Sequence, residues 1–188
     1  TPMYDIFDQM GAVWGQQYGL EVPNYFALPG EPRYEQPTFK RSNAWEATRQ
    51  EVFAVREAVG INEVQNFGKF GVKGKNARAW LDRIMAGAIP QKGRLSLTPM
   101  LSPKGKIIGD FTVTCLSETE FQITGSYGAQ DQHLRWFEKN LEEGVTVENV
   151  SDRITGFQIA GPNARKLLER VTRSDVSGEA FRFMDAKH

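Results

Sequence analysis

The sequence is poor in the residues that hold metals and form disulfides. Among 188 residues there is one cysteine, Cys115, and there are two histidines, His133 and the terminal His188. A single cysteine excludes an internal disulfide and is typical of a reducing compartment. Zinc prefers thiolate and imidazole ligands, which are too few here to form such a centre. We therefore expect no bound metal, and a cytoplasmic location or, in a eukaryote, a mitochondrial matrix location.

Long apolar runs and a net charge are also absent. No apolar run approaches the roughly 20 residues that cross a bilayer, and the N-terminus lacks the basic and then apolar pattern of a secretory signal. The 23 basic and 23 acidic side chains cancel, so no overall field attracts nucleic acid or an anionic membrane. We expect neither as a partner. The Gly-x-Gly-x-x-Gly fingerprint of dinucleotide-binding domains is missing as well.

The residues that are present suit one domain or a large piece of a bigger protein, since 40% are hydrophobic and 12 are Phe. Residues 2–18 carry aromatic side chains at helical spacing, which predicts a helix ending near Gly19. Residues 19–42 are rich in proline and aromatics, which predicts an extended arm. We therefore divide the chain into a helix and arm over residues 1–42 and a domain over residues 43–188.

From residue 43 onward the pattern predicts helices and strands in alternation. Helices are expected at residues 43–59, 76–85, 130–141 and 162–171. Strands are expected at residues 67–72, 95–101, 107–116, 121–124, 145–150 and 154–159. Ser102-Pro-Lys-Gly105 has the residues of a type I turn, so the strands on either side of it should form a hairpin. The expected fold class is α+β, an antiparallel sheet with flanking helices.

One internal repeat is visible. The segment from Val72 to Arg83 recurs 87 residues later, from Ile159 to Arg170. Each copy consists of a strand, a tight turn at Gly74 or Gly161, and a helix whose first side chains are polar. The repeat predicts a duplicated half-motif within the fold.

Asp110 is the residue that fits its pattern least well. It lies in a predicted strand with Ile108 on one side and Phe111 on the other, so simple alternation does not assign it to a solvated face. Aspartate is unfavourable within strands, and a carboxylate in apolar surroundings needs a partner or a purpose. Two interpretations follow from the residues alone. Asp110 is either a strand-edge residue in contact with water, the simpler case, or a catalytic carboxylate.

The hairpin from Leu97 to Val113, LTPMLSPKGKIIGDFTV, resembles the acidic folate-site hairpin of the glycine-cleavage T-protein (aminomethyltransferase) family. Together with residues 11–27, it looks most like the T-protein-like module of dimethylglycine and sarcosine dehydrogenases. Asp110 matches the second aspartate of the family's acidic pair, and Gly109 replaces the first. The resemblance covers nearly the whole chain and implies the N-terminal part of a T-protein-like folate-binding domain.

The resemblance implies one-carbon transfer to tetrahydrofolate. In the dehydrogenases it resembles, a flavin oxidises the methyl group of an amine, and the iminium methylene is captured as 5,10-methylenetetrahydrofolate. The resemblance makes Asp110 the catalytic carboxylate and assigns cofactor binding to Phe67, Leu97, Ile108, Thr124 and Ser126. For each apolar position, ordinary core packing is the competing interpretation. The expected partners are folate and a small methylated amine, and FAD would belong to a separate domain.

Two departures from the family bear on completeness. The second-half motif of the family, Gly-Tyr-Thr-Gly-Glu, has no counterpart in this sequence, and neither has the flavin domain. We therefore expect a fragment that lacks a C-terminal half and an upstream flavin domain, with little catalysis on its own. Two alternative functions stay open, a flavin-independent folate-dependent aminomethyltransferase or demethylase and a non-catalytic folate-sensing scaffold.

Overall fold

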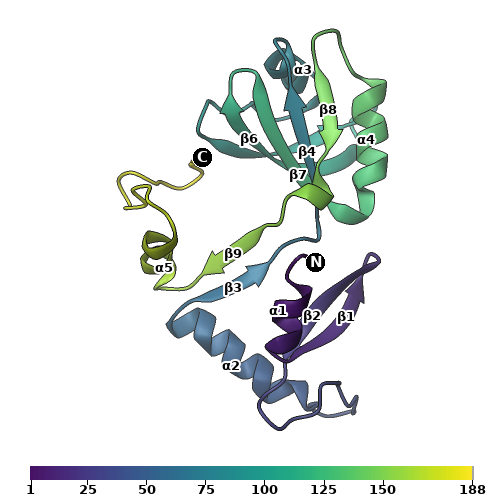
Figure 1. Ribbon diagram of the computed structural model, residues 1–188. Helices are drawn as coiled ribbons and strands as arrows, with labels where there is room; N and C mark the ends of the chain where they lie inside the picture. The colour runs from purple at the N-terminus through teal and green to yellow at the C-terminus, as the bar shows by residue number, and fades with distance from the viewer. Residues whose placement is uncertain (188) are drawn as a thin grey trace. The chain divides into compact units, whose positions relative to one another are not determined.

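The computed structural model describes residues 1–187, which divide into two compact units (Figure 1). The first unit comprises residues 1–65 and 155–176, and the second comprises residues 66–154 and 177–187. Both contain helices and antiparallel strands, which confirms the expected α+β class. Residues 1–42 share a unit with the segments that follow them, and a separate arm and folate-binding domain stay a prediction. Within the described range, no helix is both long and apolar enough to span a bilayer.

The first unit contains a hairpin, a two-stranded sheet and three helices. Its elements are α1 (Tyr4–Gln9), β1 (Ala12–Gln17), β2 (Leu20–Phe26), α2 (Ala44–Glu57), β3 (Gly60–Glu63), β9 (Phe157–Ala160) and α5 (Ala164–Val171). Strand β1 pairs with β2, and β3 pairs with β9, both antiparallel. A small core forms where Val13 and Tyr25 of the hairpin meet Ala47 of α2.

The predicted helix over residues 2–18 is wrong beyond residue 9. Gly11 has a φ of +90°, which ends α1, and Tyr18 and Gly19 both have positive φ, which reverses the chain between β1 and β2. The aromatic spacing has a different cause, because Tyr4 of α1 stacks on Trp14 of β1 with ring centroids 4.2 Å apart. A tertiary contact between a helix and a hairpin therefore produced the pattern of one long helix.

The second unit is a five-stranded antiparallel sheet with two helices. Its elements are β4 (Phe67–Lys73), α3 (Ala77–Ile84), β5 (Leu95–Leu101), β6 (Ile107–Ser117), β7 (Glu120–Ser126), α4 (Gln130–Lys139) and β8 (Thr146–Asn149). The strand order is β5-β6-β7-β4-β8. The predicted hairpin is confirmed, and the amide of Gly105 donates to the carbonyl of Ser102 at 2.8 Å, as a type I turn requires.

One face of this sheet is buried against α3 and α4. Phe70 of β4, Phe111 of β6 and Phe137 of α4 are each at most 1% exposed and form one cluster with Trp80 of α3. Because successive side chains of a strand point to opposite faces, this burial also determines which residues lie on the other face.

Both copies of the repeat form the predicted strand, turn and helix. The first copy is β4, Gly74 and α3 in the second unit, and the second copy is β9, Gly161 and α5 in the first unit. Both glycines have positive φ, +138° and +125°, and both lie against backbone. A Cβ on Gly74 would lie 1.9 Å from the carbonyl oxygen of Gly144, and one on Gly161 would lie 2.5 Å from that of Ala58.

The close approach at Gly74 predicts a stability difference between two glycines. Gly105 also has positive φ, but a Cβ there would meet nothing within 4 Å. Gly105→Ala should therefore cost only the left-handed strain of about 1 kcal/mol. Gly74→Ala should cost about 3 kcal/mol, because the backbone of Gly144 must move as well. Urea unfolding, followed by tryptophan fluorescence, measures the loss of unfolding free energy in both variants. Equal losses would contradict the close contact between Gly74 and the backbone of Gly144.

Candidate functional site

The sheet face opposite α3 and α4 collects most of the predicted site residues. We call it the Asp110 face. On β6 the residues Phe111, Val113 and Cys115 are buried against the helices, so Asp110 and Thr112 belong to the opposite face. The same alternation on the neighbouring strands adds the residues Leu97, Thr124, Ser126, Phe67 and Lys69.

One row of directly paired residues crosses four strands on this face. Leu97 of β5 pairs with Thr112 of β6, Thr112 pairs with Thr124 of β7, and Thr124 pairs with Lys69 of β4. Opposed residues of antiparallel strands have Cβ atoms roughly 5 Å apart, so these side chains are neighbours. The row has an apolar end at Leu97, which is 70% exposed, and a cationic end at Lys69.

Asp110 lies in the next row. It is two residues before Thr112 on β6, and Ser126 is two residues after Thr124 on β7, so on antiparallel strands both lie one step further in the same direction. Asp110 pairs with Pro99, and Ser126 pairs with Phe67. Five of the six predicted residues thus lie in two adjacent rows, and Asp110 is exposed. Their roles in binding and catalysis stay predictions.

Ile108 is the predicted residue that the structure does not bring to this face. Met100 pairs with Gly109 and Leu101 pairs with Ile107, so Ile108 is an extra residue in β6, a β-bulge. The bulge shifts the alternation, and Ile108 packs instead on the core cluster beside Trp136 of α4. A role for Ile108 in binding would therefore be indirect.

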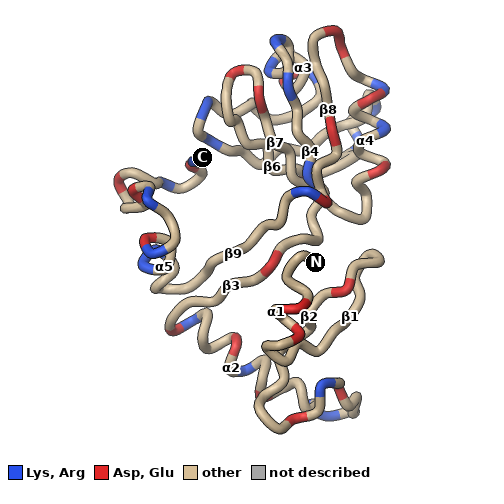
Figure 2. Tube along the Cα trace, viewed as in Figure 1, with Lys and Arg blue, Asp and Glu red and all other residues tan. Residues whose placement is uncertain are grey.

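Lys69 is a candidate that sequence reasoning missed. It is 4% exposed, and its Nζ donates to the carbonyl of Phe67 at 3.1 Å. The sequence does contain a signal for Lys69, because it is a charged residue in a strand rich in glycine and phenylalanine. Asp110 stands out in the same way in an apolar strand. The Asp110 face therefore carries both a carboxylate and an ammonium group. Acidic and basic residues both occur in each of the two units (Figure 2).

His133 of α4 lies on the helix side of the sheet and is 2% exposed. Its Nε2 lies 3.2 Å from the carbonyl oxygen of Ile108. Since a carbonyl oxygen can only accept, Nε2 carries the proton of the neutral ring. Its Nδ1 is buried and has no hydrogen-bond partner among residues 1–187. Burial lowers the pKa of His133, and the bond to the Ile108 carbonyl offsets part of that effect.

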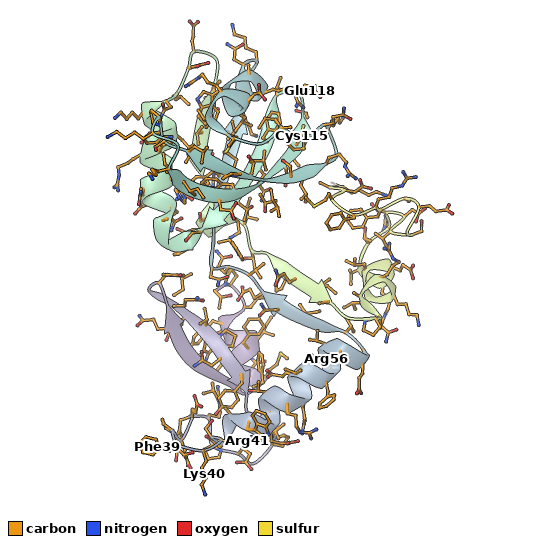
Figure 3. All side chains as sticks on the ribbon, turned by 180° about the vertical axis from the view of Figure 1, so that it is seen from behind. Phe39, Lys40, Arg41, Arg56, Cys115 and Glu118 are labelled. Atoms are coloured by element: carbon orange, nitrogen blue, oxygen red, sulfur yellow. The ribbon has the colours of Figure 1, made fainter. Side chains whose placement is uncertain are left out.

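Cys115 is a core residue. It is fully buried, and burial raises the pKa of its thiol although Arg78 Nη2 lies 3.3 Å from the sulfur. Arg78 also forms an ion pair with Glu118 at 2.8 Å, at the same end of the sheet as Cys115 (Figure 3). A protonated and buried thiol is unreactive, so Cys115 has no place among the candidate nucleophiles.

Comparison with known proteins gives concordant results. The GCVT N-terminal domain family matches residues 3–188. The chain is 34% identical over 176 residues to "Dimethylglycine dehydrogenase, mitochondrial" of Homo sapiens, a match that covers 92% of this chain and 20% of that protein. It is 26% identical over 188 residues to the aminomethyltransferase of Bacillus subtilis, covering 98% of this chain and 47% of that protein. The chain thus spans between a fifth and about half of these relatives.

Two solved structures share the fold. The glycine cleavage system aminomethyltransferase T of Bartonella henselae superposes with a TM-score of 0.75 at 19% identity, over 98% of this chain and 46% of that chain. A heterotetrameric sarcosine oxidase of Corynebacterium sp. U-96 superposes with a TM-score of 0.52 at 19% identity, over 77% of this chain and 73% of that chain. These likenesses support the T-protein-like fold that the hairpin predicted.

The environment of His133 predicts how stability depends on pH. Its folded pKa lies below the ordinary value of about 6.5, so the unfolded chain binds the proton more readily. The free energy of unfolding should therefore be highest above that value and fall as the pH drops toward the lowered pKa. His133→Gln should lose this part of the dependence. Urea unfolding of the wild type and of His133→Gln between about pH 5 and pH 8 tests this dependence. The same change of unfolding free energy with pH in both proteins would contradict the burial of a neutral ring.

Proposed function

The chain belongs to the GCVT N-terminal domain family, and on this premise we propose that it is the folate-binding front part of a one-carbon transfer enzyme. We further propose that this enzyme is of the dimethylglycine and sarcosine dehydrogenase kind, acting on a small methylated amine. This finer assignment is supported by the identity to human dimethylglycine dehydrogenase, which is 34%, compared with 26% for the aminomethyltransferase of Bacillus subtilis.

The observation that carries the proposal is the composition of the Asp110 face. A reduced pterin is a largely flat ring with apolar faces and N–H donors along its edge. Leu97 and Phe67 expose apolar surface on which such a ring can lie, and the hydroxyls of Thr124 and Ser126 can both donate and accept. When it is ionised, the carboxylate of Asp110 is a hydrogen-bond acceptor and not a donor, which suits the donor edge of the pterin. The residues present therefore fit the group.

Tetrahydrofolate, when bound, supplies the nitrogen nucleophile that takes up the one-carbon unit. Asp110 would stabilise positive charge near that nitrogen and accept its proton, because its carboxylate is exposed on this face. The apolar side chains of Leu97 and Phe67 would exclude water from the reacting carbon. Asp110 is thus proposed as the catalytic carboxylate, and Leu97, Phe67, Thr124 and Ser126 as binding residues.

Flavin chemistry is not assigned to this chain. The sequence has no dinucleotide fingerprint, so FAD would be held by a separate domain of the dehydrogenase-like enzyme. The match to human dimethylglycine dehydrogenase covers 20% of that protein, which is consistent with such a domain in the relative. A flavin-independent aminomethyltransferase is the second candidate, because the match to the Bacillus subtilis enzyme covers 98% of this chain.

Asp110→Asn should leave the fold intact and slow one-carbon transfer. The measurement needs the polypeptide extended through the region that follows the match in the aminomethyltransferases. We expect the transfer rate to fall by roughly 10²- to 10⁴-fold, the usual contribution of a general base. Asp131→Asn is the matched control, an exposed aspartate in the first turn of α4. Equal transfer rates in the wild type and Asp110→Asn would remove Asp110 from the mechanism.

Calorimetric titration with 5-formyltetrahydrofolate tests the binding proposal separately from catalysis. The chain of 188 residues and the extended polypeptide are titrated side by side. We expect clearly tighter binding by the extended polypeptide, because this chain lacks the family's Gly-Tyr-Thr-Gly-Glu motif. Binding to neither would contradict a folate enzyme and a folate-sensing scaffold alike, and would leave only a scaffold that keeps the fold without binding folate.

A further inference from the structure

The β-bulge at Ile108 determines on which face Asp110 lies. Side chains alternate with a period of two, so a shift of one residue moves every following side chain to the other face. Strand β6 begins at the turn with Ile107, which is 72% exposed, and after the extra residue the alternation resumes with Gly109 toward α4 and Asp110 away from it. If Ile108 paired regularly with Met100 in the register set by the turn, Asp110 would lie opposite the buried Thr98 and would turn toward the helices.

His133 contacts this bulge from the helix side. Its Nε2–H donates to the carbonyl of Ile108, the extra residue itself, across 25 residues of sequence. Its ring also packs edge-on against Phe111, the residue after Asp110, with centroids 4.7 Å apart. The imidazole therefore contacts β6 on both sides of Asp110 without reaching the Asp110 face.

Gly109 completes the arrangement. A Cβ at this position would lie 2.6 Å from the ring of Phe111 and 2.7 Å from Nε2 of His133. Both distances are too short for a Cβ unless His133 and Phe111 shift, so their present positions favour glycine here. The buried imidazole thus occupies space that a side chain at position 109 would need.

We infer that His133 is a positioning residue for Asp110, which holds the Ile108 bulge and so presents the Asp110 carboxylate on the opposite face of the sheet. The catalytic part of this inference, that His133 supports the rate of transfer through Asp110, rests on the proposed function of Asp110. Its structural part, that the Nε2–H of a buried histidine maintains the bulge, stands on the contacts alone.

The structural part is tested on the chain of 188 residues by nuclear magnetic resonance. Cross-strand contacts between Pro99 and Asp110 and between Met100 and Gly109 report the bulged register. His133→Phe keeps a ring but removes the donor, and it should lose these contacts. His133→Gln keeps an N–H near the position of Nε2 and should retain them. If His133→Phe does not fold, His133→Asn, whose amide is too short to reach, replaces it.

Phe137→Leu is the matched control, since Phe137 is buried on the same helix and packs on Phe111, but its side chain has no donor for the Ile108 carbonyl. It should lose stability while keeping the bulged register. An unchanged register in His133→Phe, or in His133→Asn, would overturn the inference, whatever Asp110 does.

The catalytic part is tested in the extended polypeptide by one-carbon transfer kinetics. His133→Phe should lower kcat by roughly 10- to 100-fold, the scale expected when a catalytic group is displaced by about 1 Å, with a smaller change in the KM for folate. His133→Gln should restore most of the rate, whereas Phe137→Leu should barely change it. If Asp110→Asn transfers normally, the proposed function of Asp110 fails. If Asp110→Asn is slow but His133→Phe is not, the positioning role fails alone.

Discussion

The aromatic contact among α4, β4 and β6 is the interaction on which the rest of the second unit depends. The ring centroid of Phe137 lies 5.2 Å from that of Phe70 and 5.8 Å from that of Phe111. By burying Phe70 and Phe111 on one side of the sheet, it fixes the alternation of side chains along β4 and along β6 from Gly109 onward, and the Ile108 bulge fits the turn side of β6 to that alternation. The Asp110 face is the consequence, because its polar and exposed residues are those that the aromatic cluster leaves on the other side.

Much of the second unit could be predicted from the sequence, because its signals are local. The hairpin turn, the strands β4 to β7 and the helices α3 and α4 follow from period, turn residues and glycines. The face of Asp110 could not be predicted by counting from the turn, since the Ile108 bulge, whose partner His133 lies on another element, shifts the alternation before the buried Phe111. The long helix predicted at the N-terminus failed for a similar reason, as Tyr4 and Trp14 meet through tertiary stacking.

The two copies of the repeat show how much a local sequence can specify. In the first copy Phe70 and Trp80 are fully buried, whereas Phe157, the counterpart of Phe70, is 46% exposed and α5 has no buried residue. The strand, the glycine turn and the helix nevertheless form in both. Backbone geometry at Gly74 and Gly161 therefore specifies the motif, and the surrounding core stabilises it to different degrees.

The central claim is that folate binds on the Asp110 face. A crystal structure of the extended polypeptide with 5-formyltetrahydrofolate tests it most directly. The account predicts the pterin ring against Leu97 and Thr124, with its donor edge within hydrogen-bond distance of Asp110. A pterin bound on the helix side of the sheet, or bound elsewhere with Asp110 in contact with water alone, would contradict it.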